Sequence, residues 1–292
     1  MIRFHRFQVV GCLWVLVAWV GVAQAQLVNS PRGLAMAGVR ADPVASSALI
    51  YNPAGMSRSF LYSAEFSYFR QGPDDVNAVS VNVVDSKTQP KLAAGISYGL
   101  HFTDDGAERE EAGHDVRLGF AHPAIQDTLN LGATLRYLSL EQTVNGQTDP
   151  FPEGFTMDLG VLISASSEFH IGLTAHNLID LENPNVPRRA GGGIAYTGPS
   201  ITIDVDALVD FSGYLESPQP VIAGGLELLV ANSVPLRGGF TYDGAVDQKW
   251  VSGGMGFMTG QDVNGGQFSV TYRQNIDETK AFGVGIGLTL FI

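Results

Sequence analysis

The segment from Ile201 to Phe211 reads ITIDVDALVDF and alternates between two kinds of side chain. Every odd-numbered position is apolar, and every even-numbered position except Leu208 carries threonine or aspartate. A period of two places these two sets on opposite faces of a β-strand, which a helix cannot do. The segment therefore predicts a strand with one apolar and one acidic face. Other segments with this alternation are 129–137, 169–176 and 282–292.

Applied along the whole chain, the same period predicts 14 strands between residues 61 and 292. They cover 61–70, 76–84, 91–103, 114–122, 128–140, 155–165, 168–177, 188–197, 200–211, 220–230, 234–243, 249–259, 266–274 and 281–292. One strand with its connection takes about 17 residues, which suits a membrane strand of ~9–11 residues followed by a turn. We therefore expect strands long enough to cross a bilayer.

The predicted connections differ in length according to their place in the chain. Those after even-numbered strands are short (123–127, 166–167, 198–199 and 231–233), and those after odd-numbered strands are longer (103–113, 141–154, 178–187 and 212–219). Bacterial outer-membrane barrels have short turns at one end and longer loops at the other. The fold class predicted is all-β, a transmembrane antiparallel β-barrel of about 14 strands. Strand alternation alone also fits a soluble barrel or sandwich.

The first 25 residues have the pattern of a secretory signal peptide. Arg3 and Arg6 precede an apolar run from Val9 to Val22, and Ala-Gln-Ala at 23–25 forms a cleavage site. About 14 apolar residues fall short of the ~20 that a membrane-spanning helix needs. We therefore expect residues 1–25 to be removed on export. The chain would then enter the outer membrane of a Gram-negative bacterium, surrounded by its lipid and inserted by the barrel-assembly machinery.

Composition excludes several classes of protein. The chain has 292 residues, of which 45% are apolar and 16% charged, so it is not wholly disordered. Its net charge of −12 repels phosphate, and we expect no nucleic-acid partner. The one cysteine, Cys12, lies in the predicted signal peptide, so the exported chain has no disulfide and no cysteine nucleophile. No later stretch is apolar for 18 residues, and no membrane helix is expected.

In a barrel set in lipid, the polar strand face lines the lumen. An Arg or Lys facing lipid near the midplane would cost ~2–4 kcal/mol. The charged candidates for the lumen are Arg117, Arg136, Asp158, Asp204, Asp206, Asp210, Glu227, Arg237 and Arg273. Apolar residues in the inward register could line an acyl site or pack against a plug. They are Leu138, Leu162, Leu208, Val221 and Leu229. Aromatic residues near strand ends, such as Tyr68, Phe102 and Trp250, fit either an interfacial girdle or ordinary strand composition.

Residues 26–60 do not alternate and are mostly small and apolar. The lumen of a 14-stranded barrel is wider than that of a barrel filled by its own side chains. We therefore expect three parts: a signal peptide at 1–25, a hatch at 26–60 that plugs the lumen, and the barrel at 61–292. Asn52 is expected to anchor the hatch to the barrel wall.

The run GLAMAGVRADPVASSALIYNPAGMS at 33–57 resembles the N-terminal hatch of the FadL-type fatty-acid transporter superfamily. Its core is Tyr51, Asn52, Pro53, Ala54 and Gly55. The segments HIGLTAHNLID (170–180), RRAGGGIAY (188–196) and PLRGGFTY (235–242) resemble the PorV/PorQ-like branch. The superfamily resemblance implies a 14-stranded, hatch-plugged barrel for passive uptake of hydrophobic or amphipathic small molecules such as fatty acids. The PorV-like resemblance implies an alternative, a non-transporting barrel that docks an envelope protein of a secretion or surface-attachment system.

Enzyme chemistry is not expected. His170 and His176 share a strand face but lie roughly 20 Å apart, too far for a common metal ion. Asp204 and Asp206, ~7 Å apart on one face, could act as an acid–base pair, but they are also suitable partners for hatch arginines. No set of nucleophile, base and orienting group can be assembled. We expect no catalytic residue, no metal site and no cofactor.

Overall fold

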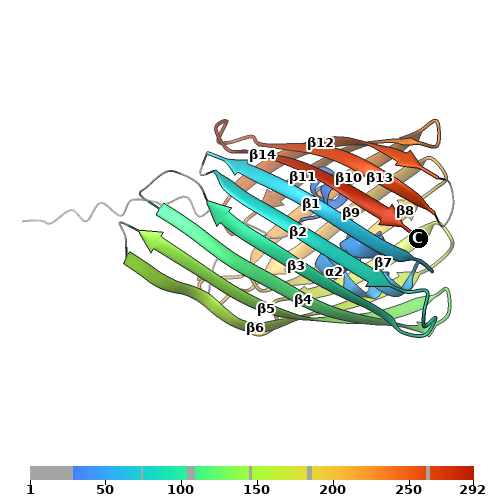
Figure 1. Cartoon of the computed structure of the whole chain (residues 1–292), viewed down its shortest axis with the longest axis horizontal. Coiled ribbons are helices and arrows are strands. Elements are labelled where there is room, and N and C mark those ends of the chain that lie inside the picture. Colours follow the sequence, from blue (N-terminus) through green and yellow to red (C-terminus); the bar gives the residue numbers. More distant parts are fainter. Residues whose placement is uncertain (1–28, 74, 104–108, 145–146, 183–185, 261–263) are drawn as a thin grey trace, which may run out of the picture.

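The computed structural model describes residues 29–73, 75–103, 109–144, 147–182, 186–260 and 264–292. These residues form a closed barrel of 14 antiparallel strands, in which the last strand returns to pair with the first (Figure 1). The strands are β1 (Tyr62–Gly72), β2 (Val76–Asp85), β3 (Ala93–Thr103), β4 (Arg109–Ile125), β5 (Leu129–Val144), β6 (Gln147–Ser164), β7 (Phe169–His176), β8 (Arg189–Thr197), β9 (Ile201–Asp210), β10 (Gln219–Val230), β11 (Val234–Asp243), β12 (Gln248–Thr259), β13 (Gly265–Asn275) and β14 (Phe282–Phe291). The predicted fold class is confirmed. The predicted signal peptide at 1–25 lies outside the described residues.

The strand predictions differ most from the structure at β4, β5 and β6. Most of the loops expected at 103–113 and 141–154 are strand, because β4 and β5 pair from Arg109 to Ile125 and β6 extends back to Gln147. Figure 1 shows these three green strands reaching beyond their neighbours at the end away from the C-terminus. The expected contrast in loop length was therefore too large. Strands that lie outside lipid can hydrogen-bond to one another without an apolar face. The alternation of apolar and polar residues therefore does not reveal these extensions.

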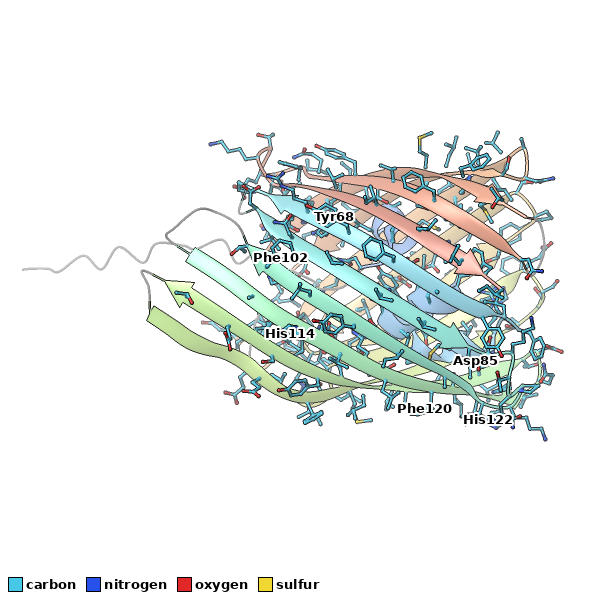
Figure 2. The ribbon with its side chains drawn as sticks, viewed as in Figure 1. Tyr68, Asp85, Phe102, His114, Phe120 and His122 are labelled. Carbon is cyan, nitrogen blue, oxygen red and sulfur yellow. The ribbon has the colours of Figure 1, made fainter. Side chains whose placement is uncertain are left out.

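The two faces of the wall have opposite character. On β9, Ile203 and Val205 are 42% and 47% exposed on the outside, whereas Asp204 and Asp206 are 1% exposed on the inside. Figure 2 shows outward-facing side chains on β1, β3 and β4, among them Tyr68, Phe102 and Phe120. Such alternation gives the barrel an apolar exterior and a polar lumen, as the sequence period predicts.

The lumen is filled by a plug segment, defined here as residues 29–60. It contains α1 (Pro31–Ala35), η1 (Ala45–Ser47), α2 (Ala48–Tyr51) and η2 (Pro53–Ser57), drawn in blue inside the barrel (Figure 1). Helix α1 packs against β11 to β14, and η2 packs against β3 to β6. The largest buried apolar cluster lies between this plug and the wall and comprises Ala48, Leu49, Met56, Val84, Ala93 and Ala121.

No helix among the described residues is both long enough and apolar enough to cross a membrane.

Candidate functional site

The predicted hatch core begins η2 and touches the barrel wall. Asn52 caps η2: its Oδ1 accepts a hydrogen bond from the backbone N–H of Ala54 at 3.2 Å. Its Nδ2 donates to the carbonyl of Arg40 at 2.8 Å and to the carbonyl of Val161 in β6 at 3.2 Å. Pro53 suits the first position of η2 because that position needs no N–H donor. Asn52 thus connects two parts of the plug to the wall.

Two wall glycines leave the space that this contact needs. A Cβ atom at Gly132 of β5 would overlap the backbone of Pro53 and Ala54. A Cβ atom at Gly160 of β6 would overlap the Oδ1 atom of Asn52. The plug backbone therefore lies directly against the wall at β5 and β6, where any larger residue would push it away.

We expect Asn52→Ala to raise the ion conductance of the barrel. The substitution leaves the buried Arg40 carbonyl and Ala54 N–H without this partner, at about 1–3 kcal/mol for each unsatisfied group, and removes the hydrogen bond to the Val161 carbonyl of the wall. Single-channel recording in planar bilayers measures the effect. Gln126→Ala, in an exposed turn outside the lumen, is the control. Conductance equal to that of the unmodified chain would contradict an anchoring role for Asn52.

Asp42 of the plug is the centre of a charge cluster. Its carboxylate accepts from Arg32 Nη2 at 2.5 Å, from Arg58 Nη1, and from Thr197 Oγ1 of β8 at 3.0 Å. Its backbone N–H donates to Asp204 Oδ2 of β9 at 2.9 Å. Burial alone would raise the pKa of Asp42, but the Arg32 and Arg58 guanidinium groups outweigh burial and hold it below its usual value. Asp42 therefore stays ionised and links plug to wall.

Two ion pairs join the plug to the wall. Arg40 Nη1 lies 3.1 Å from Asp206 Oδ2, and the Arg40 backbone N–H donates to the same oxygen at 3.3 Å. Arg32 Nε lies 3.4 Å from Glu227 Oε2, which also accepts from Arg237 Nε at 2.5 Å. The sequence left two roles open for Asp204 and Asp206, an acid–base pair or partners of the hatch arginines. In the structure both carboxylates accept from the hatch, Asp204 from the Asp42 backbone N–H and Asp206 from Arg40.

On the opposite wall, Asp115 of β4 joins two arginines. It lies 2.9 Å from Arg117 Nη2 and 2.7 Å from Arg136 Nη2. Arg136 Nη1 also donates to Asn177 Oδ1 at 2.8 Å, and the Asn177 backbone N–H donates to Asp158 Oδ1 at 2.8 Å. Sequence reasoning did not select Asn177, which follows β7 with a positive φ of 53°. Its signal was the His-Asn pair inside the segment 170–180, since asparagine tolerates this conformation.

A third wall cluster centres on Arg189 of β8. Its Nε lies 3.0 Å from Asp210 Oδ2, and its Nη2 lies 2.7 Å from Asp243 Oδ2. Asp210 was predicted to face the lumen, whereas Arg189 and Asp243 were not selected because they stand at strand ends. The structure thus divides the predicted lumen charges among separate ion-pair clusters and does not gather them at one point.

A cavity of about 160 Å³ lies above the plug, on the side away from the C-terminus; it is called the upper cavity below. Its floor includes Leu34 and Tyr51 of the plug, and its wall includes His176, Trp250 and Arg273. Burial raises the pKa of Tyr51 to about 12, so its phenol stays protonated. The upper cavity is lined by both polar and apolar side chains.

The predicted apolar lumen residues do not form one site. Val221 lines the upper cavity, whereas Leu138 packs against Leu140 and Val186. Leu162 and Leu208 are buried, and Leu229 is half-buried near the opposite end of β10. The acyl site considered for these five side chains is therefore not assembled by the structure.

Trp250 faces the lumen on β12, so of the two interpretations left open by the sequence, the interfacial girdle does not apply to it. The tryptophan falls in the same register as Ser252, which donates to the plug carbonyl of Ala35 at 2.9 Å. Its ring lies beside Arg273. The reason is local: a guanidinium group inside the lumen attracts an aromatic face, and composition alone cannot reveal this.

Within the described ranges, no three His, Cys, Asp or Glu side chains are grouped as metal ligands.

Together these features define a 14-stranded β-barrel with a luminal plug and an upper cavity. Its fold is similar to that of the CymD monoaromatic hydrocarbon channel, with a TM-score of 0.70 and 11% identity over 91% of this chain and 98% of that chain. A Pseudomonas aeruginosa FadL homologue gives a TM-score of 0.62 and 11% identity over 90% and 97%. The P. putida toluene transporter TodX gives 0.59 and 11% over 90% and 98%. No protein-family profile and no curated protein matches the sequence.

Proposed function

We propose that this chain is an outer-membrane barrel for passive uptake of small hydrophobic or amphipathic molecules. The observation that carries the proposal is the upper cavity, which ends on a plug held to the wall by hydrogen bonds and ion pairs. A solute entering this cavity would meet the plug, and movement of the plug would open the remaining path. The apolar outer face supports a membrane setting.

This proposal assigns a role to each part of the chain. Residues 1–25 direct export, residues 26–60 act as the hatch, and residues 61–292 form the barrel. In this proposal the end with the C-terminus and the short turns faces the periplasm, which puts the upper cavity on the outer side of the plug. The charged lumen residues hold the hatch closed and do not themselves bind an apolar solute.

The size of the upper cavity favours small solutes. A protein cavity of about 150 Å³ holds one benzene molecule. The 160 Å³ here therefore suits a single ring and is too small for a long acyl chain. The names of two similar structures, a monoaromatic hydrocarbon channel and a toluene transporter, agree with this preference for a small solute.

The experiment that tests the proposal is uptake by intact cells. A Gram-negative host without its own FadL-type barrel would express this chain and receive radiolabelled toluene or oleate. We expect faster uptake of toluene than in the host with an empty vector, and a smaller change for oleate. Unchanged uptake of both solutes, with the protein folded in the outer membrane, would contradict transport and favour the docking role.

A further inference from the structure

Arg273 of β13 is a lumen cation without an acidic partner among the described residues. Its guanidinium carbon lies 4.5 Å from the ring centroid of Trp250 and 5.0 Å from that of Phe69. Its Nη2 donates to the amide oxygen of Gln71, and its buried Nε has no hydrogen-bond partner within the described part of the chain. Arg273 thus contributes a positive charge to the wall of the upper cavity.

The other arginines of the upper cavity differ in this respect. Each has a carboxylate oxygen within 3.1 Å: they are Arg40 with Asp206, Arg117 and Arg136 with Asp115, and Arg189 with Asp210 and Asp243. A half-buried charge without a counter-charge is unfavourable, since burial removes water that would solvate it. An anion bound beside Arg273 would supply that counter-charge.

The surroundings of Arg273 are shaped to hold it in place. Gly283 lies opposite Arg273 on β14. A Cβ atom at Gly283 would come within 2.8 Å of the Phe69 ring and 3.0 Å of Arg273 Cγ, so glycine leaves the space that both side chains occupy. With rings on both sides and Gln71 at one nitrogen, the guanidinium group is held in position before any ligand arrives.

We propose that the upper cavity binds a single-ring aromatic carboxylate, whose carboxylate pairs with Arg273. A planar guanidinium group matches a planar carboxylate through parallel N–H donors. The cavity volume admits one ring. This inference rests on the proposed uptake function for the route by which the ligand arrives, and it narrows the substrate class from hydrophobic solutes in general to small aromatic anions.

Equilibrium binding to protein purified from the outer membrane tests the proposal. Trp14 and Trp19 lie in the predicted signal peptide, so Trp250 is the single tryptophan of the processed chain, and its fluorescence reports on the site. The probes are benzoate and benzamide, which have similar shape but differ in charge. We expect saturable quenching by benzoate, with at least about tenfold weaker binding of benzamide, as one charge-assisted pair supplies.

The second part of the experiment substitutes Arg273. Arg273→Gln should weaken benzoate binding about tenfold and leave benzamide binding unchanged, and Arg273→Lys should keep the preference for the anion. Arg70→Gln, at a cation on the outer face of the adjoining wall, is the matched control and should behave as the unmodified chain. Calorimetry repeats the measurement without relying on Trp250. Heat-dependent mobility on gels checks that each variant is folded.

The outcomes separate this inference from the proposed uptake function. Equal affinity for benzoate and benzamide, or unchanged benzoate affinity in folded Arg273→Gln, would overturn the anion site. Toluene uptake by cells together with such a result would leave the uptake proposal standing. Benzoate binding that depends on Arg273, in a protein that moves no toluene, would support the anion site and contradict only the uptake proposal.

Discussion

Gly132→Val is expected to raise the open probability of the barrel about tenfold or more. The Cβ atom of valine would overlap the backbone of Pro53 and Ala54, which cannot rotate away as a side chain can. Overpacking of this kind costs about 1–3 kcal/mol, and 1.4 kcal/mol is a tenfold change in an equilibrium. Because the clash exists only while η2 lies against β5, it destabilises the plugged state and leaves the open state unaffected.

Single-channel recording of Gly132→Val in planar bilayers measures this effect. The matched control is Gly238→Val on β11, which carries the same change on the outer face of the wall. The nearest atom to a Cβ at Gly238 is the carbonyl oxygen of Ser252 at 3.9 Å, so no clash is expected. If both variants recorded like the unmodified chain, the plug would not be what closes the lumen.

Asp42→Ala is expected to open the barrel further, by about a hundredfold in open probability. Asp42 is 2% exposed in its side chain and pairs with Arg32 and Arg58. Removing one partner from a buried ion pair costs about 3–5 kcal/mol, because the remaining charge is left without compensation. Arg58 would keep its contact with His170, whose ring nitrogen lies 2.9 Å from Arg58 Nη2. The plug would lose the hydrogen bond from Thr197 of β8, and the Arg32 and Arg58 guanidinium groups within the plug would lose their shared carboxylate.

The control for Asp42→Ala is Asp180→Ala, which removes an ion pair with Arg188 in a loop near the rim. Partly exposed pairs of this kind contribute about 0–1 kcal/mol, so little change in conductance is expected. A thermal melt of both variants separates loss of the plug from loss of the barrel. Equal open probability in the two variants would show that Asp42 does not hold the plug.

The direction of the Asp42 pKa predicts how its contribution depends on pH. Its pKa in the folded chain is below the usual value near 3.8. A carboxylate with a lowered pKa stabilises the folded state at all pH values above its unfolded pKa, and the contribution is lost as pH falls through the folded value. The contribution of Asp42 to closure is therefore constant between pH 7 and pH 5, within which open probability should not change on its account.

The wall was predictable from the sequence because a closed barrel imposes a rule on every strand. A strand residue faces either the outside or the lumen, so the alternation in 201–211 gives the wall two different faces. The same rule placed Asp204, Asp206 and Arg273 in the inward register. It does not require alternation in strand ends that extend beyond their neighbours, and those parts of β4, β5 and β6 were taken for loops for that reason.

The candidate site was less predictable, since partner choice depends on distances across the lumen. Asp206 and Arg40 are separated by 166 residues in the chain, and Asn52 meets Val161 across 109 residues. Asn177 meets Arg136 because the chain turns after β7, and Trp250 lies beside the Arg273 cation. None of these partners is marked by spacing, and charge type alone does not say which acid meets which arginine.

The sequence by itself determined the strand period, the strand number and the presence of a small-residue segment ahead of the barrel, because those features depend on each residue's own polarity and size. Only the tertiary structure decided how the plug is held, where the upper cavity lies and that Arg273 has no acidic partner among the described residues. Closing the barrel brings strands from both ends of the chain around one plug. The pairings inside it follow from that three-dimensional proximity, which no local pattern encodes.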